Sequence, residues 1–229
     1  MTANEIIRIA IDGPAAAGKS TVAKLIADKL NFVYIDTGAM YRALTLKVIQ
    51  EQIKFDNEKM ITETLTNTKI EFKSVADGQL VFLDDIDVTS KIRSTEVSQA
   101  VSHIAQLAEV RKQLVLRQQL LANNHSVVMD GRDIGTTVLP DAEVKVFLIA
   151  SVDERAQRRH DENIKKGFSS DLQLLKEEIA ERDHRDENRK ESPLKKAKDA
   201  VSIDTTAMSI DDVVEKIIKL VTDYKNKAR

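Results

Sequence analysis

Cysteine is absent from this sequence, and glycine, proline and aromatic residues are scarce. The 229 residues include no Cys and no Trp, only 7 Gly and 3 Pro, and 4% aromatic residues. Without cysteine the chain can form neither a disulfide nor a thiolate metal site. The low aromatic content and the net charge of -2 argue against a non-enzymatic nucleotide- or nucleic-acid-binding module, which would need a basic surface with aromatic side chains.

Long apolar segments are missing as well. The N-terminal stretch MTANEIIRIAIDG has no basic region followed by a long apolar one, so it does not look like a secretory signal. No run of about 18 apolar residues is present that could span a bilayer. We therefore expect a cytoplasmic protein without a membrane partner. We also expect a monomer that has no nucleic acid as a partner.

Apolar runs of strand length alternate with helical patterns along much of the chain. The expected strands cover residues 6–11, 32–35, 127–129, 144–149 and 200–203. The expected helices include residues 19–30 and 39–50 and a last helix capped by Ser209. This alternation predicts an α/β fold with a central parallel sheet flanked by helices.

The pattern differs between residues 56 and 93. Two runs of strand type, 69–75 and 80–86, flank Ala76-Asp77-Gly78-Gln79, which is typical of a hairpin turn. We therefore predict a small α+β insertion over residues 56–93. The stretch 95–123 that follows is helical in pattern, as one long helix or as two.

Two of the few glycines frame the clearest motif of the sequence. Gly13-Pro14-Ala15-Ala16-Ala17-Gly18-Lys19-Ser20 matches G-x-x-x-x-G-K-[ST] between an expected strand and an expected helix, and Thr21 follows. Glycine lets backbone N–H groups turn inward around anionic oxygens, and the helix N-terminus adds its positive dipole end. Lys19 would reach the β- and γ-phosphates, and the Ser20 hydroxyl would join the shell of a Mg²⁺ ion. The motif predicts a nucleoside triphosphate site, with ATP as the ligand.

Kinases, switch GTPases and motor-type ATPases all use such a phosphate loop. A regulatory GTPase would also carry an N-K-x-D guanine motif, and the sequence has none. A kinase needs a second pocket for its acceptor. Arginine suits a phosphate there, because its planar fork donates two parallel hydrogen bonds.

Arginines gather between residues 155 and 189 on two expected helices, which begin with capping-box patterns at Ser151 and Ser170. Each helix has one charged face: Arg155, Arg158 and Arg159 on the first, and Arg182, Asp186 and Arg189 on the second. Such a pair is either a solvated charged surface or a lid that closes over phosphates. Because a phosphate loop is present in the same chain, we favour a lid over residues 151–189.

Three expected strands end in an acid followed by a small residue: Asp12-Gly13, Asp36-Thr37 and Asp130-Gly131. Ligands of open α/β sheets bind beyond the carboxyl ends of the strands, so these segments would face one pocket. The segments after the second and third of these strands also carry Arg42 and Arg132. Either of these two segments alone could be an ordinary strand-to-helix turn with a surface salt bridge. Because both occur in a chain with a phosphate loop, we favour a ligand pocket.

The sequence resembles the bacterial cytidylate kinases, a family of P-loop nucleoside monophosphate kinases. The resemblance rests on IDGPAAAGKST, YIDTGAMYRA, IRSTEVSQAVSHIA with VRKQL, VMDGRDIGT, SVDERAQRR and ERDHRDENR, which cover nearly the whole chain in order. It implies a P-loop NTPase fold with a core over 1–55, 94–150 and 190–229, a monophosphate-binding insertion over 56–93 and a helical lid over 151–189. The implied reaction transfers the γ-phosphoryl group of ATP to CMP or dCMP with Mg²⁺, as a step of pyrimidine nucleotide metabolism.

The resemblance also implies roles for single residues. Residues 13–21 would bind ATP, with Ser20 as the metal ligand. The residues implied to act on the transferring phosphoryl group or its acceptor are Lys19, Arg132, Arg155, Arg159 and Arg189. Asp130 would either join the magnesium shell or position Arg132, and both options stay open.

The implied acceptor site is a set of polar residues from several segments. Its members are Thr37, Tyr41, Arg42, Ser102, Arg111, Asp130, Arg132, Asp133, Arg182, Asp186 and Arg189. Arg42, Arg132 and Arg189 would hold the monophosphate, with Tyr41 lining the site and Asp186 accepting from the ribose hydroxyls. Ser102, Arg111 and Asp133 would bind the cytosine edge, which offers an amino donor and N3/O2 acceptors. A kinase for a different nucleoside monophosphate or for shikimate is the closest alternative, and this last set separates the two.

Overall fold

A computed structural model describes residues 6–75, 78–165 and 167–227 of the chain. The chain divides into two compact units. Unit 1 comprises residues 1–33 and 124–229, and unit 2 comprises residues 34–123. Unit 2 is therefore one continuous segment, whereas unit 1 is built from two segments that are distant in the sequence.

Unit 1 is built on parallel strands: β1 (Arg8–Asp12), β6 (Val127–Gly131), β7 (Val144–Ile149) and β8 (Val201–Asp204). β1 lies between β6 and β7, so that Ile9 is opposite Val128 on one side and Val144 on the other. β8 continues the sheet beyond β7. The central strands are apolar and buried along nearly their whole length, as expected for a parallel sheet that is covered on both faces.

The complete strand order is β2-β6-β1-β7-β8, which confirms the expected parallel α/β architecture. β2 (Val33–Asp36) begins at the last residue of the first segment of unit 1. There the Val33 N–H donates to the Ser126 carbonyl at 2.9 Å.

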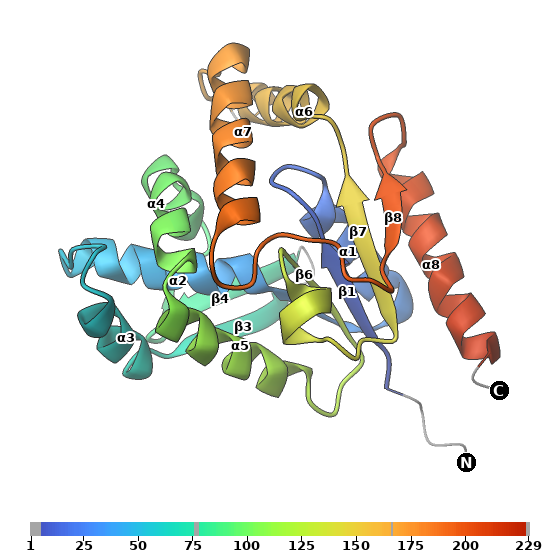
Figure 1. The fold of residues 1–229 in the computed structure, drawn as a ribbon, viewed down its shortest axis with the longest axis horizontal. Helices are drawn as coiled ribbons and strands as arrows, with labels where there is room; N and C mark the ends of the chain where they lie inside the picture. The colour runs from blue at the N-terminus through green and yellow to red at the C-terminus, as the bar shows by residue number, and fades with distance from the viewer. Residues whose placement is uncertain (1–5, 76–77, 166, 228–229) are drawn as a thin grey trace. The chain divides into compact units, whose positions relative to one another are not determined.

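The helices of unit 1 are α1 (Lys19–Leu30), α6 (Val152–Lys165), α7 (Leu172–Asn188) and α8 (Ile210–Lys227), with a single π-helical turn, η2 (Ile134–Val138). α1 packs on β6 and on α8, and α8 also packs on β7, so these two helices cover one face of the sheet (Figure 1). Four apolar residues of α8 are buried: Val213, Val214, Ile217 and Val221. α6 and α7 pack against each other.

Unit 2 is organised around α2 (Thr37–Gln50). Its other elements are α3 (Glu58–Thr66), β3 (Ile70–Val75), β4 (Gly78–Leu83), β5 (Ile86–Asp87), η1 (Lys91–Arg93), α4 (Thr95–Ala105) and α5 (Ala108–Ala122). One side of α2, with Met40 and Leu44, packs on the apolar residues of α3, α4 and α5. The other side, with Ala39 and Ala43, packs on those of β4 and η1. The helix is therefore buried on two sides and fixes the positions of the elements around it.

The predicted hairpin is confirmed, because β3 and β4 pair antiparallel from Ile70 opposite Leu83 to Val75 opposite Gly78. Residues 76 and 77 of the predicted turn lie outside the described residues. The stretch 95–123 forms two helices. The sequence did not indicate α3, the short strand β5 or the turn η2.

The helix caps agree with the sequence at two of three positions. The Ser151 Oγ accepts from the Glu154 N–H at 3.2 Å, and the Ser209 Oγ accepts from the Asp212 N–H at 3.2 Å. The predicted cap of α7 at Ser170 is wrong, because the Asp171 Oδ1 accepts from the Leu174 N–H at 3.0 Å. The Ser170 hydroxyl instead accepts from the Asn163 side chain on α6 at 3.3 Å.

The compact units differ from the regions inferred from the sequence. Unit 2 contains the insertion expected over 56–93, but it also takes in α2, α4 and α5. The physical reason is the apolar cluster that joins α2, α3, α4 and α5 into one core. The residues 151–189 expected as a lid fall within unit 1.

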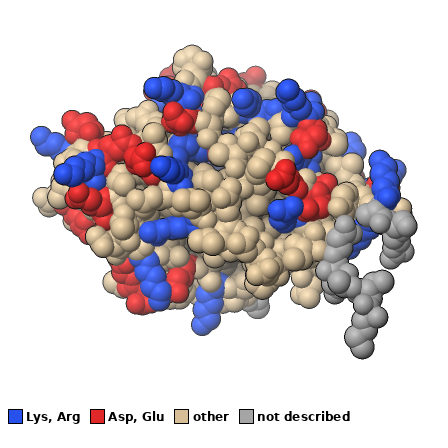
Figure 2. Space-filling model, turned by 60° about the horizontal axis from the view of Figure 1, so that its bottom comes forward, with Lys and Arg blue, Asp and Glu red and all other residues tan. Residues whose placement is uncertain are grey.

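No helix within the described residues is long and apolar enough to cross a bilayer. Figure 2 shows acidic and basic side chains intermixed across the face that it draws. Charges of both signs therefore lie on this face.

The turn after β1 makes a glycine necessary at position 13. Gly13 has φ +149°, and a Cβ atom there would lie 2.3 Å from the Leu148 carbonyl oxygen on β7. Gly18 also has positive φ, at +82°, but a Cβ atom there would meet nothing within 4 Å. The two glycines of the motif are therefore required for different reasons.

We expect Gly13→Ala to lower the free energy of unfolding by at least about 2 kcal/mol, because it adds backbone overlap to an unfavourable φ. Gly18→Ala is the matched control and should cost about 1 kcal/mol, the price of the left-handed conformation alone. Urea denaturation of the three proteins measures both values. Equal losses in the two variants would contradict the close approach of Gly13 to β7.

Candidate active site

The segment between β1 and α1 turns sharply through three residues of positive φ. Gly13 has φ 149°, Ala16 has φ 59° and Gly18 has φ 82°. Gly18 is the N-cap of α1 and makes no side-chain capping bond, so the first N–H groups of the helix are not satisfied by a cap. A loop of this form, followed directly by an uncapped helix N-terminus, is suited to bind an anion.

Lys19 lies at the start of α1 and is buried. Its Nζ donates to the Pro14 carbonyl at 2.6 Å, so the side chain folds back over the loop. Burial lowers the pKa of Lys19 well below its ordinary value, and the charges of Arg132 and Arg182 lower it further, whereas Asp130 acts in the opposite direction. Positive groups are therefore crowded beside the loop, and an anion bound there would relieve their repulsion.

Ser20 and Asp130 meet next to this loop. The Ser20 Oγ donates to the Asp130 Oδ2 at 2.7 Å, which joins the start of α1 to the end of β6. Hydroxyl and carboxylate oxygens are the ligands that Mg²⁺ prefers, and the ion commonly takes only one or two protein groups together with substrate phosphates. The pair fits such an ion, although no group of three or more His, Cys, Asp or Glu side chains in the described part of the chain could form a metal cage.

A second group of arginines surrounds Asp186 on α7. The Arg132 Nε donates to the Asp186 Oδ2 at 2.9 Å. Burial would raise the pKa of Asp186, but the neighbouring charges of Arg132, Arg182 and Arg189 hold that pKa below its usual value. The structure therefore brings together Arg132, Arg182, Asp186 and Arg189, four of the residues expected at the acceptor.

Asp133 and Arg189 are also neighbours. The Arg189 Nη2 lies 3.4 Å from the Asp133 Oδ1, and both side chains are almost fully buried. The Arg189 Nε also donates to the Ser192 carbonyl at 2.8 Å. Arg189 is the residue directly after α7 rather than part of its last turn, so its direction is set by these contacts.

Arg155 is the most enclosed of the expected lid arginines. Its Nη1 donates to the Ala15 carbonyl at 3.1 Å and to the Asp183 Oδ2 at 2.5 Å, and its Nε donates to the Ala150 carbonyl at 2.9 Å. The Asp183 Oδ1 in turn accepts from the Ala15 N–H at 3.3 Å. Arg155 and Asp183 thus fasten α6 and α7 to the phosphate loop.

The other two arginines of α6 have different partners. The Arg158 Nη2 donates to the Thr205 carbonyl at 2.6 Å, after β8. Arg159 is exposed and makes an ion pair of 3.5 Å with Glu162 on the same helix. The face that the sequence assigns to three arginines therefore divides into a buried, a half-buried and a solvated side chain.

In unit 2 the buried carboxylate of Asp36 holds two arginines. The Arg42 Nη2 and the Arg93 Nη2 each lie 3.0 Å from the Asp36 Oδ2, and the Asp36 Oδ1 accepts from the Ala39 N–H at 2.9 Å. Burial would raise the pKa of Asp36, but Arg42 and then Arg93 reverse this effect and lower it. The buried Arg42 Nε has no hydrogen-bond partner among the described residues. Thr37 follows Asp36 and is buried at the start of α2.

Arg111 and Tyr41 are stacked in the same unit. The Arg111 guanidinium lies 5.5 Å from the centre of the Tyr41 ring, and its Nη1 donates to the Ala105 carbonyl at 3.0 Å. Ser102 lies on α4 and is partly exposed. This cation–π contact and the hydrogen bond to Ala105 hold the guanidinium of a buried arginine against the tyrosine ring.

Two residues at these clusters were missed in the sequence, Arg93 and Asp183, and Asp12 was identified only as an acid at a strand end, without a role of its own. Arg93 completes the Asp36 pair, and Asp183 completes the Arg155 contact. Asp12 ends β1 with a buried carboxylate. The position of Asp12 at the end of a strand could have indicated a role for it. No sequence pattern indicates Arg93 or Asp183, because their contacts join residues that are 57 and 28 positions apart.

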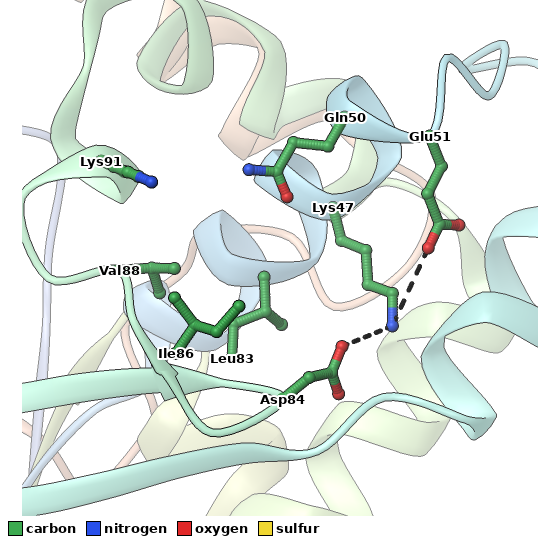
Figure 3. Close-up of a pocket in the computed structure, with 8 residues that line it drawn as sticks. All are labelled: Lys47, Gln50, Glu51, Leu83, Asp84, Ile86, Val88 and Lys91. Atoms are coloured by element: carbon green, nitrogen blue, oxygen red, sulfur yellow. Dashed lines mark hydrogen bonds and ion pairs between the residues drawn. The ribbon is translucent and has the colours of Figure 1, made fainter.

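A surface cavity of about 270 Å³ lies elsewhere in unit 2, between the end of α2 and the loop after β4 (Figure 3). Leu83, Ile86 and Val88 form its apolar part. The Lys47 ammonium at its edge is paired with Asp84 at 2.6 Å and with Glu51 at 3.9 Å. None of the expected site residues lines this cavity. We therefore locate the candidate site at the charged clusters rather than at this hollow.

Comparisons with known proteins show the family to which the chain belongs. A model of the cytidylate kinase family matches residues 9–223. The chain belongs to the cytidylate kinase family. It is 60% identical over 217 residues to the cytidylate kinase of Geobacillus sp. (strain WCH70), which covers 95% of this chain and 97% of the relative. It is 57% identical over 221 residues to the cytidylate kinase of Oceanobacillus iheyensis, with 96% of both chains covered.

Solved structures show the same fold at low identity. A gluconokinase from Sinorhizobium meliloti 1021 has a TM-score of 0.50 at 16% identity, covering 97% of this chain and 95% of its own. An uncharacterized protein from Eubacterium ventriosum has a TM-score of 0.52 at 14% identity, covering 96% and 99%. These likenesses support the P-loop kinase fold, and family membership makes the protein a phosphotransferase of the nucleoside monophosphate kinase type.

We expect Asp36→Asn to lower the free energy of unfolding at pH 7 by about 2 kcal/mol, because two arginines lose a buried counter-charge while the helix cap is kept. The lowered pKa of Asp36 means that the carboxylate stabilises the fold above the ordinary pKa of 3.8 and that this contribution is lost as the pH falls below it. The variant should therefore lose less stability on acidification than the wild type. Urea denaturation at several pH values measures this.

Asp56→Asn serves as the control, since Asp56 is an exposed acid of the same unit. It should leave both the stability and its acid dependence within about 0.5 kcal/mol of the wild type. If Asp36→Asn behaved like Asp56→Asn, the two arginines would not depend on the buried carboxylate.

Proposed function

We propose that this protein transfers the γ-phosphoryl group of ATP to CMP or dCMP and releases ADP with CDP or dCDP. The observation that carries the proposal is the crowding of Lys19, Arg132 and Arg182 beside the phosphate loop, where their charges lower the pKa of Lys19. Several cations gathered in a buried place favour polyanionic ligands. A nucleoside triphosphate and a nucleoside monophosphate together supply the anions.

On the donor side, residues 13–21 would bind the phosphates of ATP. The positive φ values of the loop and the uncapped N-terminus of α1 support this assignment. Lys19 would exchange its bond to the Pro14 carbonyl for an oxygen of the β- or γ-phosphate. Ser20 and Asp130 would hold Mg²⁺. That ion, when bound, would neutralise charge on the β- and γ-phosphate oxygens.

On the acceptor side, unit 1 would supply Arg132 and Arg189 to the monophosphate, with Arg182 nearby. Asp186 already accepts a hydrogen bond from Arg132, and the charges of Arg182 and Arg189 also act on its carboxylate. In the complex Asp186 would accept from the ribose hydroxyls, and Asp133 would accept from the amino group of cytosine. A carboxylate is a suitable partner for that donor.

Arg42 would also bind the monophosphate, since its buried Nε has no hydrogen-bond partner among the described residues. Thr37 and Tyr41 would line the same subsite. Ser102 and Arg111 would bind the acceptor atoms of the cytosine ring, and the stacking of Arg111 on Tyr41 supports a fixed direction for that arginine.

The reaction needs little covalent chemistry from the protein. An oxygen of the CMP phosphate is already an anion, so it attacks the γ-phosphorus without a general base. The new P–O bond forms as the bond between the γ-phosphorus and its bridging oxygen breaks, and ADP leaves with the electron pair. The protein contributes position and positive charge.

Arg155 and Arg159 would act as lid residues at the transferring phosphoryl group. Arg159 can reorient easily, because its single exposed ion pair with Glu162 is weak. Arg155 would first have to exchange its bonds to Asp183 and Ala15 for a phosphate oxygen.

The direct test is an assay of ADP release from ATP with a panel of nucleoside monophosphates, namely CMP, dCMP, UMP, AMP and GMP, and with shikimate. We expect the highest kcat/KM for CMP and dCMP. A higher value for a purine nucleotide or for shikimate would refute the proposed acceptor while leaving the phosphotransferase class intact.

Lys19→Ala should reduce kcat about a hundredfold or more, because a charge that stabilises the transferring phosphate is lost. Its unfolding free energy should stay the same or rise, since burial already penalises the charged form of Lys19. Lys29→Ala removes an exposed lysine from the last turn of the same helix and should leave kcat unchanged. Steady-state kinetics with CMP and a thermal melt of each protein test this.

Arg189→Ala should raise KM for CMP by about tenfold or more and change KM for ATP far less, because the residue belongs to the arginine group around Asp186. The control is Arg185→Ala, which removes an exposed arginine from α7. Kinetics with each substrate varied in turn provide the comparison. Equal effects on both substrates would mean that Arg189 does not belong to the acceptor site.

A further inference from the structure

Asp12 is a buried carboxylate at the end of β1, directly before the phosphate loop. Its two oxygens accept from two successive backbone groups of another segment. The Ile134 N–H donates to Oδ1 at 2.7 Å, and the Gly135 N–H donates to Oδ2 at 2.8 Å. Both acceptor atoms are therefore used in one bidentate contact across 122 residues of sequence.

The bonded groups are the first residues of the π-helical turn η2, which follows Arg132 and Asp133 without a break. The residue before this turn, Asp133, makes no side-chain cap for it. Asp12 therefore supplies from a different strand the acceptor that the start of η2 lacks. Because Arg132 and Asp133 directly precede η2 in the chain, the position of this turn constrains the positions of both residues.

The contact leaves little room for movement. A Cβ atom on Gly135 would lie 3.4 Å from the Asp12 Oδ2 and 3.3 Å from the Cδ of Lys145. On the other side of Asp12, Gly13 approaches the backbone of β7 too closely for any side chain. One residue thus joins two tightly packed turns, the phosphate loop and the start of η2.

We propose that Asp12 is a positioning residue that sets the acceptor-binding Arg132 and Asp133 at a fixed distance from the phosphate loop through its two hydrogen bonds to η2. The proposal rests on the proposed function, in which Arg132 and Asp133 bind the monophosphate nucleotide. Asp12 itself would touch neither substrate.

The charges around Asp12 make its ionisation measurable. Burial raises its pKa to about 6, the two backbone N–H groups act against that shift, and Asp133 raises the pKa while Lys19 lowers it. The ammonium of Lys145, whose stem packs on Gly135, is paired with Asp199 at 2.7 Å. Below this pKa one oxygen carries a proton and accepts poorly, so the bond from Ile134 or Gly135 weakens.

Asp12→Asn separates positioning from simple stability. The asparagine keeps the volume, but its NH₂ group would face one of the two N–H donors. We expect KM for CMP to rise about tenfold to a hundredfold, because a small misplacement of binding groups is costly. The dissociation constant of a fluorescent ATP analogue, measured without CMP, should change less than about twofold.

Glu143→Gln is the matched control. Glu143 also accepts a backbone N–H in unit 1, from Arg8 at 2.7 Å, but at the opposite end of β1. The control should lower stability without raising KM for CMP more than about twofold. If Asp12→Asn folded and kept KM for CMP within twofold of the wild type, or lost ATP and CMP binding equally, the proposal would be wrong.

Amide resonances give a readout that does not depend on turnover. The monophosphate of the acceptor itself titrates near pH 6, so a pH–rate profile alone cannot identify Asp12. In the nucleotide-free protein, the amide signals of Ile134 and Gly135 should shift with a midpoint near pH 6. The shift should vanish in Asp12→Asn and persist in Glu143→Gln. If the amide signals of Ile134 and Gly135 in the wild type did not change with pH, the proposed role of Asp12 would be refuted.

Two alternative experiments apply if Asp12→Asn does not fold or if the wild type does not use CMP. If Asp12→Asn does not fold, Gly135→Ala displaces the same turn from the carboxylate and should produce the same KM split, whereas unchanged kinetics would refute the proposal. If the wild type does not use CMP, the proposed function fails, and the preferred acceptor from the panel takes the place of CMP in the same comparison.

Discussion

Buried positive charge beside the phosphate loop is the constraint on which the structure of unit 1 depends. Lys19, Arg132 and Arg182 influence one another through space, and burial strengthens their repulsion. Such an arrangement is stable without a ligand only if carboxylates lie among the cations. Asp130 and Asp186 have that position in unit 1. The carboxylates of Asp130 and Asp186 thus stabilise, in the free protein, the cationic residues that would bind phosphate.

The same design is repeated at each cluster. Asp183 engages Arg155, and Asp133 lies beside Arg189. In unit 2, Asp36 holds Arg42 and Arg93. A carboxylate gives a guanidinium a bidentate or charge-assisted partner, so the arginine loses little freedom when a phosphate arrives. The cost is that each acid must be released or shared when the anion binds.

The sequence predicted those parts of the fold that depend on local pattern. The glycines and Lys19 identified the loop, and the bounds predicted for α1 and β7 agree with the structure. Contacts between residues distant in the sequence could not be predicted. No periodicity in the sequence indicates that Arg93 pairs with Asp36 or that Asp183 pairs with Arg155. The cap of α7 was misassigned because Ser170 and Asp171 are adjacent and both suit the position.

The discontinuity of unit 1 has a consequence for synthesis on the ribosome. β1 and the phosphate loop emerge early, but the strands that flank β1 follow only after residue 124. Unit 2 is contiguous, so its helices can collapse on α2 while β1 still waits for both neighbours. During translation the nascent nucleotide loop therefore remains unsupported until β6 and β7 have left the exit tunnel.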